Sequence, residues 1–330
     1  MFDLKNPEIQ FAIHAVQQAG LATRLVQAEM VSPALTKDDR SPVTVADFTA
    51  QAVIGSLLSQ AFPDDCMIAE EDSAALRAPE GKETLDQVRY FSGEFVDGAS
   101  AEAVCSWIDH GRVDRAARFW CLDPIDGTKG FLRGDQYAVA LALVIDGQVQ
   151  IGVLGCPNLV NGYQPDLNGA GSLVIAVRGQ GTWTTSLQSP GSYLRLYASQ
   201  QTDPAQARVL RSFESGHTNA DQIDLLGEKL GIQAAPVLMD SQAKYAVLAA
   251  GQAELMLRLL SPSKPLYKEK IWDQAAGSLV LEESGGQLSD LDGKPLDFTT
   301  GRSLVNNRGI LASNKLLHET ALRGLRAVDA

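Results

Sequence analysis

Two aspartates, Asp123 and Asp126, lie three residues apart in the stretch Asp-Pro-Ile-Asp-Gly-Thr. The apolar run 119–122 precedes them and predicts a short buried strand that ends where the carboxylates begin. Pro124 fixes its own φ, and the glycine after Asp126 favours a turn. Two carboxylates at a rigid strand end repel each other unless a cation is present, and Mg²⁺ prefers carboxylate and carbonyl oxygens. The stretch indicates a metal site, although most Asp-x-x-Asp pairs are solvated acidic turns.

Further acidic residues lie beside two other expected elements. Thr44 and Asp47 have the spacing of a capping box at the start of a helix, so Asp47 also has a structural interpretation as an acid favoured by the helix dipole. Glu70 is the first of three acids that end a short strand over 67–72. An acidic cluster at a strand end is unusual as plain surface, and it indicates a second edge that faces a metal.

Charge and composition limit the function classes. The 330-residue chain has 28 Lys and Arg against 40 Asp and Glu, a net charge of −12, which argues against binding nucleic acid polymers or anionic membranes. The beginning of the sequence is too polar for a signal peptide, and no apolar run approaches the length of a membrane span. The four cysteines show no Cys-x-x-Cys spacing, so we expect reduced thiols and a cytoplasmic protein.

The order of predicted elements indicates two domains. Residues 1–204 are expected to form an α+β domain of helices on an antiparallel sheet, and residues 205–330 an α/β domain. Asp146-Gly147 is a strong hairpin signal between two of the strands. The expected helices cover 7–27, 44–62, 219–231, 241–250, 272–284 and 314–327, and the expected strands cover 67–72, 119–122, 137–145, 148–154, 173–177, 182–185, 208–212, 236–239, 254–259 and 310–312.

Three separated motifs in order resemble the inositol monophosphatase-like superfamily of Mg²⁺-dependent, lithium-sensitive phosphatases. They are Glu70-Glu71, Asp123-Pro-Ile-Asp-Gly-Thr128 and Trp272-Asp273-Gln-Ala-Ala-Gly277. The resemblance covers essentially the whole chain and implies the layered αβαβα sandwich of the inositol monophosphatase and fructose-1,6-bisphosphatase type. The 3′(2′),5′-bisphosphate nucleotidase branch is indicated by the run 123–132, Glu214-Ser-Gly-His217, Asp240-Ser-Gln-Ala-Lys-Tyr245 and Lys268-Glu-Lys-Ile-Trp-Asp273.

The resemblance implies two Mg²⁺ ions, consistent with phosphate ester hydrolysis by paired metals. Glu70, Asp123 and the carbonyl of Ile125 are expected to hold one ion, while Asp123, Asp126 and Asp273 are expected to hold the other.

Asp47 and Thr128 are expected to orient and activate the attacking water. Asp47 and Glu70 are also expected to help hold a third, weaker ion. The backbone N–H groups of Gly127, Thr128 and Lys129 are candidate contacts to phosphate oxygens.

Substrate choice is expected to depend on the second domain, where His217, Ser241, Lys244 and Arg258 match nucleotide-contacting positions. Lys and Arg attract a second phosphate, and an imidazole can stack on a purine. Each residue also has a structural alternative: Lys244 as a solvated charge on an amphipathic helix, Arg258 as a strand-edge charge, and His217 as a helix cap.

The resemblance therefore predicts an enzyme that removes the 3′-phosphate of adenosine 3′,5′-bisphosphate, with 3′-phosphoadenylyl sulfate as a second candidate substrate. Alternatives within the superfamily are an inositol (poly)phosphate 1-phosphatase and a sugar bisphosphatase. A catalytically silent nucleotide-binding regulator is a different class, and the presence of all candidate ligands together with Thr128 argues against it. The expected partner is a small phosphorylated nucleotide, and the sequence carries no prediction of the oligomeric state.

Overall fold

The computed structural model describes residues 2–30, 41–213 and 219–328. Within these ranges the strands form a seven-stranded sheet, a five-stranded sheet and a two-stranded ribbon. The seven-stranded sheet has the order β1-β2-β3-β4-β7-β8-β9 and is antiparallel, except that β1 runs parallel to β2. Its strands are β1 (Cys66–Ala69), β2 (Arg118–Asp126), β3 (Ala138–Ile145), β4 (Gln148–Cys156), β7 (Ser172–Val177), β8 (Gly181–Ser186) and β9 (Leu194–Leu196), and the ribbon consists of β5 (Leu159–Val160) and β6 (Gln164–Pro165).

The five-stranded sheet comes entirely from the later part of the chain and has the order β11-β10-β12-β14-β13. It is mixed, because β10 runs parallel to β11 and β12, whereas β14 runs antiparallel to β12 and β13. Its strands are β10 (Val209–Arg211), β11 (Val237–Leu238), β12 (Leu255–Arg258), β13 (Gln287–Ser289) and β14 (Ile310–Ser313).

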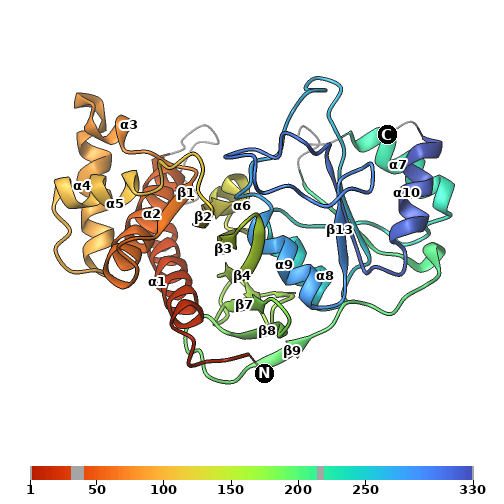
Figure 1. Cartoon of the computed structure of the whole chain (residues 1–330), viewed down its shortest axis with the longest axis horizontal. Coiled ribbons are helices and arrows are strands. Elements are labelled where there is room, and N and C mark those ends of the chain that lie inside the picture. Colours follow the sequence, from red (N-terminus) through yellow and green to blue (C-terminus); the bar gives the residue numbers. More distant parts are fainter. Residues whose placement is uncertain (1, 31–40, 214–218, 329–330) are drawn as a thin grey trace.

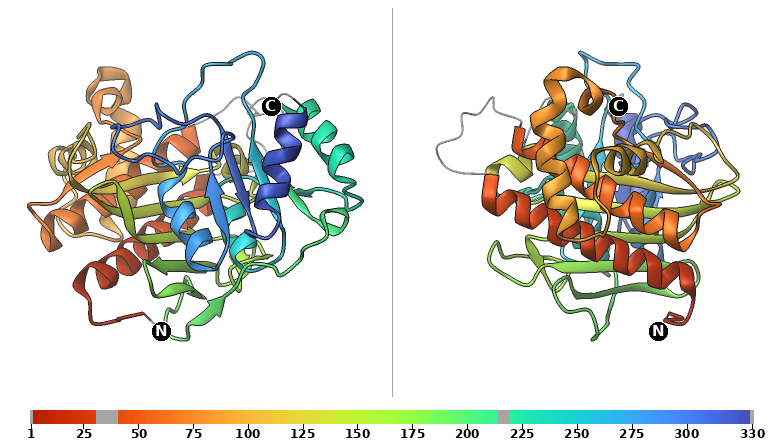
Figure 2. Two further views of the ribbon diagram at one scale, coloured as in Figure 1. Left: turned by 45° about the vertical axis from the view of Figure 1, so that its right-hand side comes forward. Right: turned by 90° about the vertical axis from the view of Figure 1, so that its left-hand side faces the viewer.

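Helices and sheets alternate in five layers, as Figure 1 shows. The helices α1 (Pro7–Met30) and α2 (Ser41–Ala61) cover one face of the seven-stranded sheet, and Figure 2 shows them running side by side across it. The helices α8 (Ala243–Ala249) and α9 (Ala275–Glu283) lie between the two sheets and share one apolar cluster with both. Helices from the second half of the chain thus complete the core of the first sheet.

The remaining helices lie on the outside of this arrangement. The far face of the five-stranded sheet packs against α7 and α10, while α4 and α5 pack against α2. None of the described helices combines the length and apolar composition needed to cross a membrane. The bounds are α3 (Ala74–Arg77), α4 (Lys82–Gly93), α5 (Ala101–Asp109), α6 (Thr128–Arg133), α7 (Ala220–Leu230) and α10 (His318–Ala327), with 3₁₀ turns η1 (Pro79–Gly81) and η2 (Pro204–Gln206).

The central strand β3 illustrates why the seven-stranded sheet needs helices on both faces. Its alternate residues Ala138, Ala140 and Ala142 join the cluster around α8 and α9, while Val139 and Leu141 join the cluster around α1. Because side chains alternate between the faces of a strand, a continuous apolar run is stable only when both faces are covered.

The expected hairpin at Asp146-Gly147 is confirmed, with both residues at positive φ (50° and 75°), as a type I′ turn between β3 and β4 requires. The hairpin of β7 and β8 is also confirmed. The helix expected to start at Thr44 begins earlier, at Ser41, so the capping-box interpretation of Thr44 and Asp47 is wrong. The short strands β9 and β13 have no counterpart among the expected elements.

The expected end of the strand at residue 122 is also wrong, since β2 continues to Asp126. The chain passes Pro124 by a register shift in the pairing with β3 rather than by leaving the sheet. A proline is tolerated at such a bulge because the ladder is already interrupted there.

Candidate active site

The irregularity in β2 places Asp123 and Asp126 on one face of the sheet. Asp123 pairs with Ala140, and Asp126 pairs with Ala138, although the aspartates are three residues apart and the alanines only two. In a regular strand, residues three apart point to opposite faces, so the extra residue of the bulge turns Asp126 to the side of Asp123. Ile125 instead packs into a cluster with α2 and α6. The two carboxylates face α8 and α9.

The strand β1 and helix α2 bring further acids to the same strand ends. Ala69 pairs with Leu122 in the parallel ladder, so Glu70 follows β1 at the level where Asp123 follows Leu122. The buried side chain of Gln51 on α2 fixes the neighbouring backbone: its Oε1 accepts from the N–H of Glu71 (3.1 Å), and its Nε2 donates to the Glu71 carbonyl (2.7 Å).

Asp47 lies one helical turn before Gln51, on the same side of α2. Its carboxyl is buried and is close enough to Glu70 and Glu71 that both raise its pKa. The structure therefore places Asp47, a candidate through the resemblance, beside the acid cluster.

Asp273 reaches the cluster from the second half of the chain, two residues before α9. Arg258, at the end of β12, holds this carboxylate in the structure: its NH1 lies 3.6 Å from Asp273 Oδ2, and its NH2 lies 3.1 Å from Glu269 Oε2. Glu269 was not among the predicted site residues, although it lies within the run Lys268–Asp273 that indicated the nucleotidase branch.

The acid cluster carries more negative charge than its surroundings stabilise. Burial, and then Glu70 and Asp126, raise the pKa of Asp123 well above its ordinary value. Burial also raises the pKa of Asp273, although Arg258 opposes the shift. Glu70 keeps contact with solvent, but partial removal from water and the Glu71 carboxylate raise its pKa to about 7. Acids arranged in this way favour a bound cation, which would stabilise the ionised forms.

The residues fit a hard divalent cation in their chemistry. They supply oxygen donors, and the buried Oδ1 of Asp123 has no hydrogen-bond partner in the protein. Among the described residues, no three His, Cys, Asp or Glu side chains form a ready-made ligand set. In this arrangement Arg258 pairs with Asp273, and the N–H of Gln242 donates to Asp126 Oδ2 at 2.8 Å.

Gly127 and Ser241 are brought together, as expected for residues of one substrate site. Gly127 precedes α6 with a φ of 91°, and a Cβ on it would lie 2.8 Å from the Cβ of Ser241. Ser241 itself has a φ of 67°, a left-handed conformation that is uncommon outside glycine. Thr128 is exposed at the first position of α6, and within the described ranges no hydrogen bond joins it to Asp47.

Two cations, the buried Lys244 and the partly exposed Arg258, flank the acids on the side of the second sheet. The Nζ of Lys244 donates to Ser212 Oγ at 2.8 Å, and burial, followed by the Arg258 charge, lowers the pKa of Lys244 to about 8. Burial raises the pKa of Asp126, and both cations oppose that shift, so they lie near its carboxylate. The structural alternative of a solvated Lys244 is therefore wrong, while Arg258 is a partly exposed charge at the end of β12 that pairs with Glu269 and Asp273. His217 lies outside the described residues.

Arg302 is a further site residue that the sequence did not reveal. Its guanidinium donates to the carbonyls of Ala69 and Gly111 and lies 4.7 Å from the ring centroid of Trp272. It therefore joins the end of β1 to the segment that carries Asp273. Its partners are backbone atoms distant in sequence, which no local pattern could indicate.

Comparison with known proteins agrees with this arrangement. Residues 5–329 match the inositol monophosphatase family, and the chain belongs to this family. A relative named 3′(2′),5′-bisphosphate nucleotidase from Schizosaccharomyces pombe is 41% identical, covering 98% of this chain and 96% of that protein. One of the same name from Oryza sativa is 42% identical over 97% of this chain and 95% of its own length. The predicted family is confirmed.

Solved structures show the same fold at low sequence identity. An inositol monophosphatase from Zymomonas mobilis superposes with a TM-score of 0.65 at 19% identity, covering 98% of this chain and 100% of the other. CysQ from Bacteroides thetaiotaomicron, a bacterial member of the inositol monophosphatase family, gives a TM-score of 0.60 at 18% identity, with 93% and 97% covered. These likenesses confirm the predicted layered αβαβα sandwich.

Proposed function

We propose that the chain is a 3′(2′),5′-bisphosphate nucleotidase, a phosphoric monoester hydrolase that converts adenosine 3′,5′-bisphosphate to AMP and phosphate. 3′-Phosphoadenylyl sulfate, which has the same 3′-phosphate, is a second proposed substrate. The observation that carries the proposal is the placement of two cations, the buried Lys244 and the partly exposed Arg258, beside the acid cluster. One phosphate would lie at the acids and the other at the cations. The full-length relatives that bear this name support the same reaction.

The proposed cofactor is Mg²⁺, in agreement with the metal dependence of the family. Glu70, Asp123 and the Ile125 carbonyl would hold one ion, and Asp123, Asp126 and Asp273 would hold a second. Bound there, the ions would supply an activated water and charge stabilisation at the leaving oxygen.

The chain's own residues would orient the water and position the phosphates. We assign Asp47 and Thr128 to orienting the water, and Asp47 with Glu70 to a third, weaker ion. Lys244 and Arg258 would bind the second phosphate, with Arg258 offering a two-pronged donor. Gly127 and Ser241 would form the wall between the two phosphates, because they are in close contact. His217 remains a proposed contact to the base.

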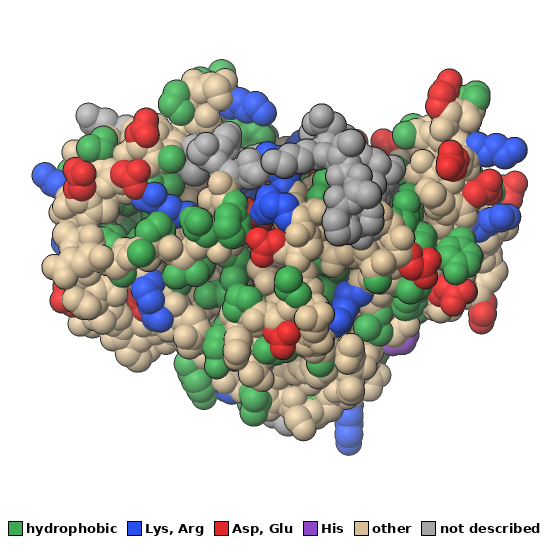
Figure 3. Space-filling view, turned by 180° about the vertical axis from the view of Figure 1, so that it is seen from behind, with side chains coloured by type: hydrophobic (Ala, Val, Ile, Leu, Met, Phe, Trp, Pro, Cys, Tyr) green, Lys and Arg blue, Asp and Glu red, His purple; other side chains and the backbone are tan. Residues whose placement is uncertain are grey.

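The proposed partner is this small nucleotide rather than a nucleic acid polymer or a membrane. On the face shown in Figure 3, acidic and basic side chains are interspersed, and the drawn residues form no extended basic surface. The four cysteines are free thiols, three of them buried, which supports the proposal of a cytoplasmic location.

The test is the release of phosphate, with Mg²⁺ present, from five substrates. They are adenosine 3′,5′-bisphosphate, 3′-phosphoadenylyl sulfate, inositol 1-phosphate, inositol 1,4-bisphosphate and fructose 1,6-bisphosphate. We expect the highest kcat/KM for adenosine 3′,5′-bisphosphate. A higher value for an inositol or sugar ester would replace the proposed substrate with one of the superfamily alternatives. Nucleotide binding by calorimetry without release of phosphate from any ester would instead indicate a silent regulator.

A further inference from the structure

Gln242 links the two parts of the chain that carry Asp126 and Asp273. Its side chain is 2% exposed and lies at the start of α8, between the two sheets. The backbone N–H of Gln242 donates to Asp126 Oδ2 at 2.8 Å. Its Nε2 donates to the carbonyl of Trp272 at 2.9 Å, and its Oε1 accepts from the N–H of Gly277 at 3.0 Å.

These bonds hold the segment around Asp273 at two points. Trp272 directly precedes Asp273, and Gly277 lies in the first turn of α9, where backbone N–H groups lack partners within the helix. The residue before α9, Gln274, provides no side-chain cap of its own. Gln242 therefore acts as a cap supplied from another helix, and it fixes both the entry to α9 and the residue beside Asp273.

A second contact from α8 holds the other neighbour of Asp273. The hydroxyl of buried Tyr245 donates to Gln274 Oε1, and the Nε2 of Gln274 donates to Glu269 Oε2 at 3.2 Å. Both neighbours of Asp273 are thus tied to α8, Trp272 through its carbonyl and Gln274 through its side chain. Only the Gln242 link also contacts a carboxylate of β2.

The geometry points to Gln242 as a positioning residue that sets the placement of Asp273 relative to Asp126, so that both carboxylates reach one divalent cation. The inference rests on the proposed function, in which these two aspartates share an ion. Partners that orient metal ligands typically affect metal affinity by about 10- to 100-fold.

The test is the affinity of the full chain for Mn²⁺ alone, from the free Mn²⁺ signal in electron paramagnetic resonance, without substrate. Gln242→Met keeps the length of the side chain and removes both side-chain hydrogen bonds, while the backbone bond to Asp126 remains available. We expect its Kd for Mn²⁺ to rise about 10- to 100-fold, with a matching loss of the thermal shift that Mg²⁺ gives the wild-type protein. A Kd within twofold of wild type would overturn the inference.

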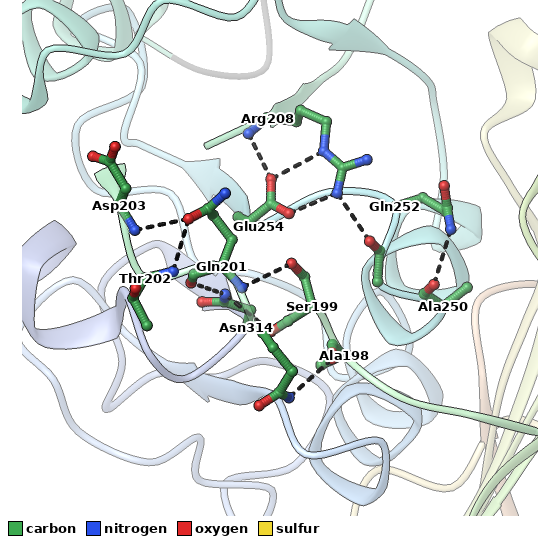
Figure 4. A network of polar contacts seen from close by, with 12 residues as sticks. Ala198, Ser199, Gln201, Thr202, Asp203, Arg208, Ala250, Gln252, Glu254 and Asn314 are labelled. Atoms are coloured by element: carbon green, nitrogen blue, oxygen red, sulfur yellow. Dashed lines mark hydrogen bonds and ion pairs between the residues drawn. The ribbon is translucent and has the colours of Figure 1, made fainter. Parts of the chain in front are cut away.

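Asn314→Leu is the matched control. Asn314 is also a buried amide, and it donates to the carbonyls of Ser199 and Gln201 and accepts from the N–H of Leu317. Figure 4 shows it in a separate polar network with Arg208 and Glu254, at the end of β12 opposite to Arg258. We expect Asn314→Leu to lower the Tm and leave the Mn²⁺ affinity unchanged. An equal loss of affinity in both variants would mean general destabilisation and would overturn the inference.

Two further outcomes separate the possibilities. If Gln242→Met does not fold, the Kd for Mn²⁺ is measured on Gln242→Asn instead. The shorter amide of asparagine cannot reach Trp272 and Gly277 together, so we expect the same loss of affinity. If neither variant folds, Gln242 serves stability alone and the inference is wrong. If the wild-type protein binds no Mn²⁺, the proposed metal site fails, whereas wild-type binding with unchanged variants rejects only the role of Gln242.

Discussion

Asp126 is the residue at which the two halves of the site meet. It lies on β2, accepts a hydrogen bond from Gln242, and is close enough to Lys244 and Arg258 that both lower its pKa. Burial nevertheless raises the pKa of Asp126 overall, so its charge is unfavourable in the metal-free protein. Such a carboxylate contributes to binding a cation rather than to the stability of the metal-free fold.

For Asp126→Asn we therefore expect turnover to fall by more than about 100-fold, a loss typical of removing a group that stabilises charge in the transition state. The Tm of the metal-free protein should stay equal or rise, since the amide removes a repelling charge and can still accept from Gln242. Steady-state kinetics measure the fall in turnover, and thermal unfolding measures the Tm. Unchanged kinetics would remove Asp126 from the site.

Lys244 gives the site a pH dependence of its own. Because its pKa is lowered to about 8, the ammonium loses its proton in the free enzyme as the pH rises through that value. We expect kcat/KM for adenosine 3′,5′-bisphosphate to fall across this range, and to fall less in Lys244→Arg, since arginine stays charged. Adenosine 3′-monophosphate, which lacks the second phosphate, serves as the control substrate. An identical pH profile for both substrates would argue against the proposed contact.

At the scale of elements, the bend from β2 into α6 depends on Gly127. Its φ of 91° is unfavourable for other residues, and a Cβ would meet Ser241 at 2.8 Å and the carbonyl of Gln136 at 3.2 Å. Gly134, at the other end of α6, also has positive φ (69°), but a Cβ there would meet nothing within 4 Å. A substitution at Gly134 therefore tests backbone strain alone, whereas one at Gly127 tests strain together with a steric clash.

Gly134→Ala should reduce the free energy of unfolding by about 1–2 kcal/mol, the range expected for strain alone, and leave activity intact. Gly127→Ala should be more destabilising and should lower kcat/KM, because Thr128 and Ser241 must move. Denaturant unfolding and kinetics of both variants test this. Equal effects of the two substitutions would show that the contact with Ser241 is unimportant.

The sequence predicted the elements whose signals are local. The long helix α1, the strands β3 and β4 and their hairpin follow from apolar periodicity and from Asp146-Gly147. The predicted strand end at residue 122 is wrong because a bulge depends on the pairing of the neighbouring strand and has no signature in its own residues. Edge strands as short as β9 carry too few residues for a pattern.

Five acids of the cluster are among the residues predicted from the sequence, whereas Glu269, Arg302 and the amides that hold the acids are not. Glu70, Asp123, Asp126 and Asp273 stand in motifs of the family, and Asp47 is a candidate through the resemblance alone. The structure gathers all five in one cluster. Gln51 stands in no motif, and Gln242 lies in the run Asp240–Tyr245 with no role assigned to it from sequence. Both amides bind backbone atoms brought near only by folding. A glutamine in a helix is usually a surface residue, so sequence alone gives no reason to select these two.

At the scale of the whole molecule, the acid cluster should determine how stability varies with pH. The carboxyl of Glu70 has a folded-state pKa of about 7 against an ordinary value of 4.5, and Asp47, Asp123 and Asp273 are raised as well. The folded state then binds more protons than the unfolded state, so this contribution to stability is full at low pH and is lost as the pH rises through the folded pKa.

Without metal, we expect the Tm to fall as the pH rises from about 5 to about 8, and added Mg²⁺ to restore most of the loss at the higher pH. Carboxyls with lowered pKa, such as Asp65, titrate below this window and do not mask the effect. Glu70→Gln should flatten the dependence. A Tm that rises over the same range would contradict the assignment of these acids to one buried cluster.

The position of α8 and α9 between the sheets has a consequence for how the protein is made. The seven-stranded sheet is complete once β9 has been synthesised, yet the helices that cover its second face lie about 50 to 90 residues further along the chain. During synthesis, one apolar face of that sheet therefore has no partner until the middle layer arrives. A proposed boundary near residue 204 divides the sequence but not the core, so a fragment ending there should aggregate, whereas addition of the remaining residues in the same chain allows cooperative folding.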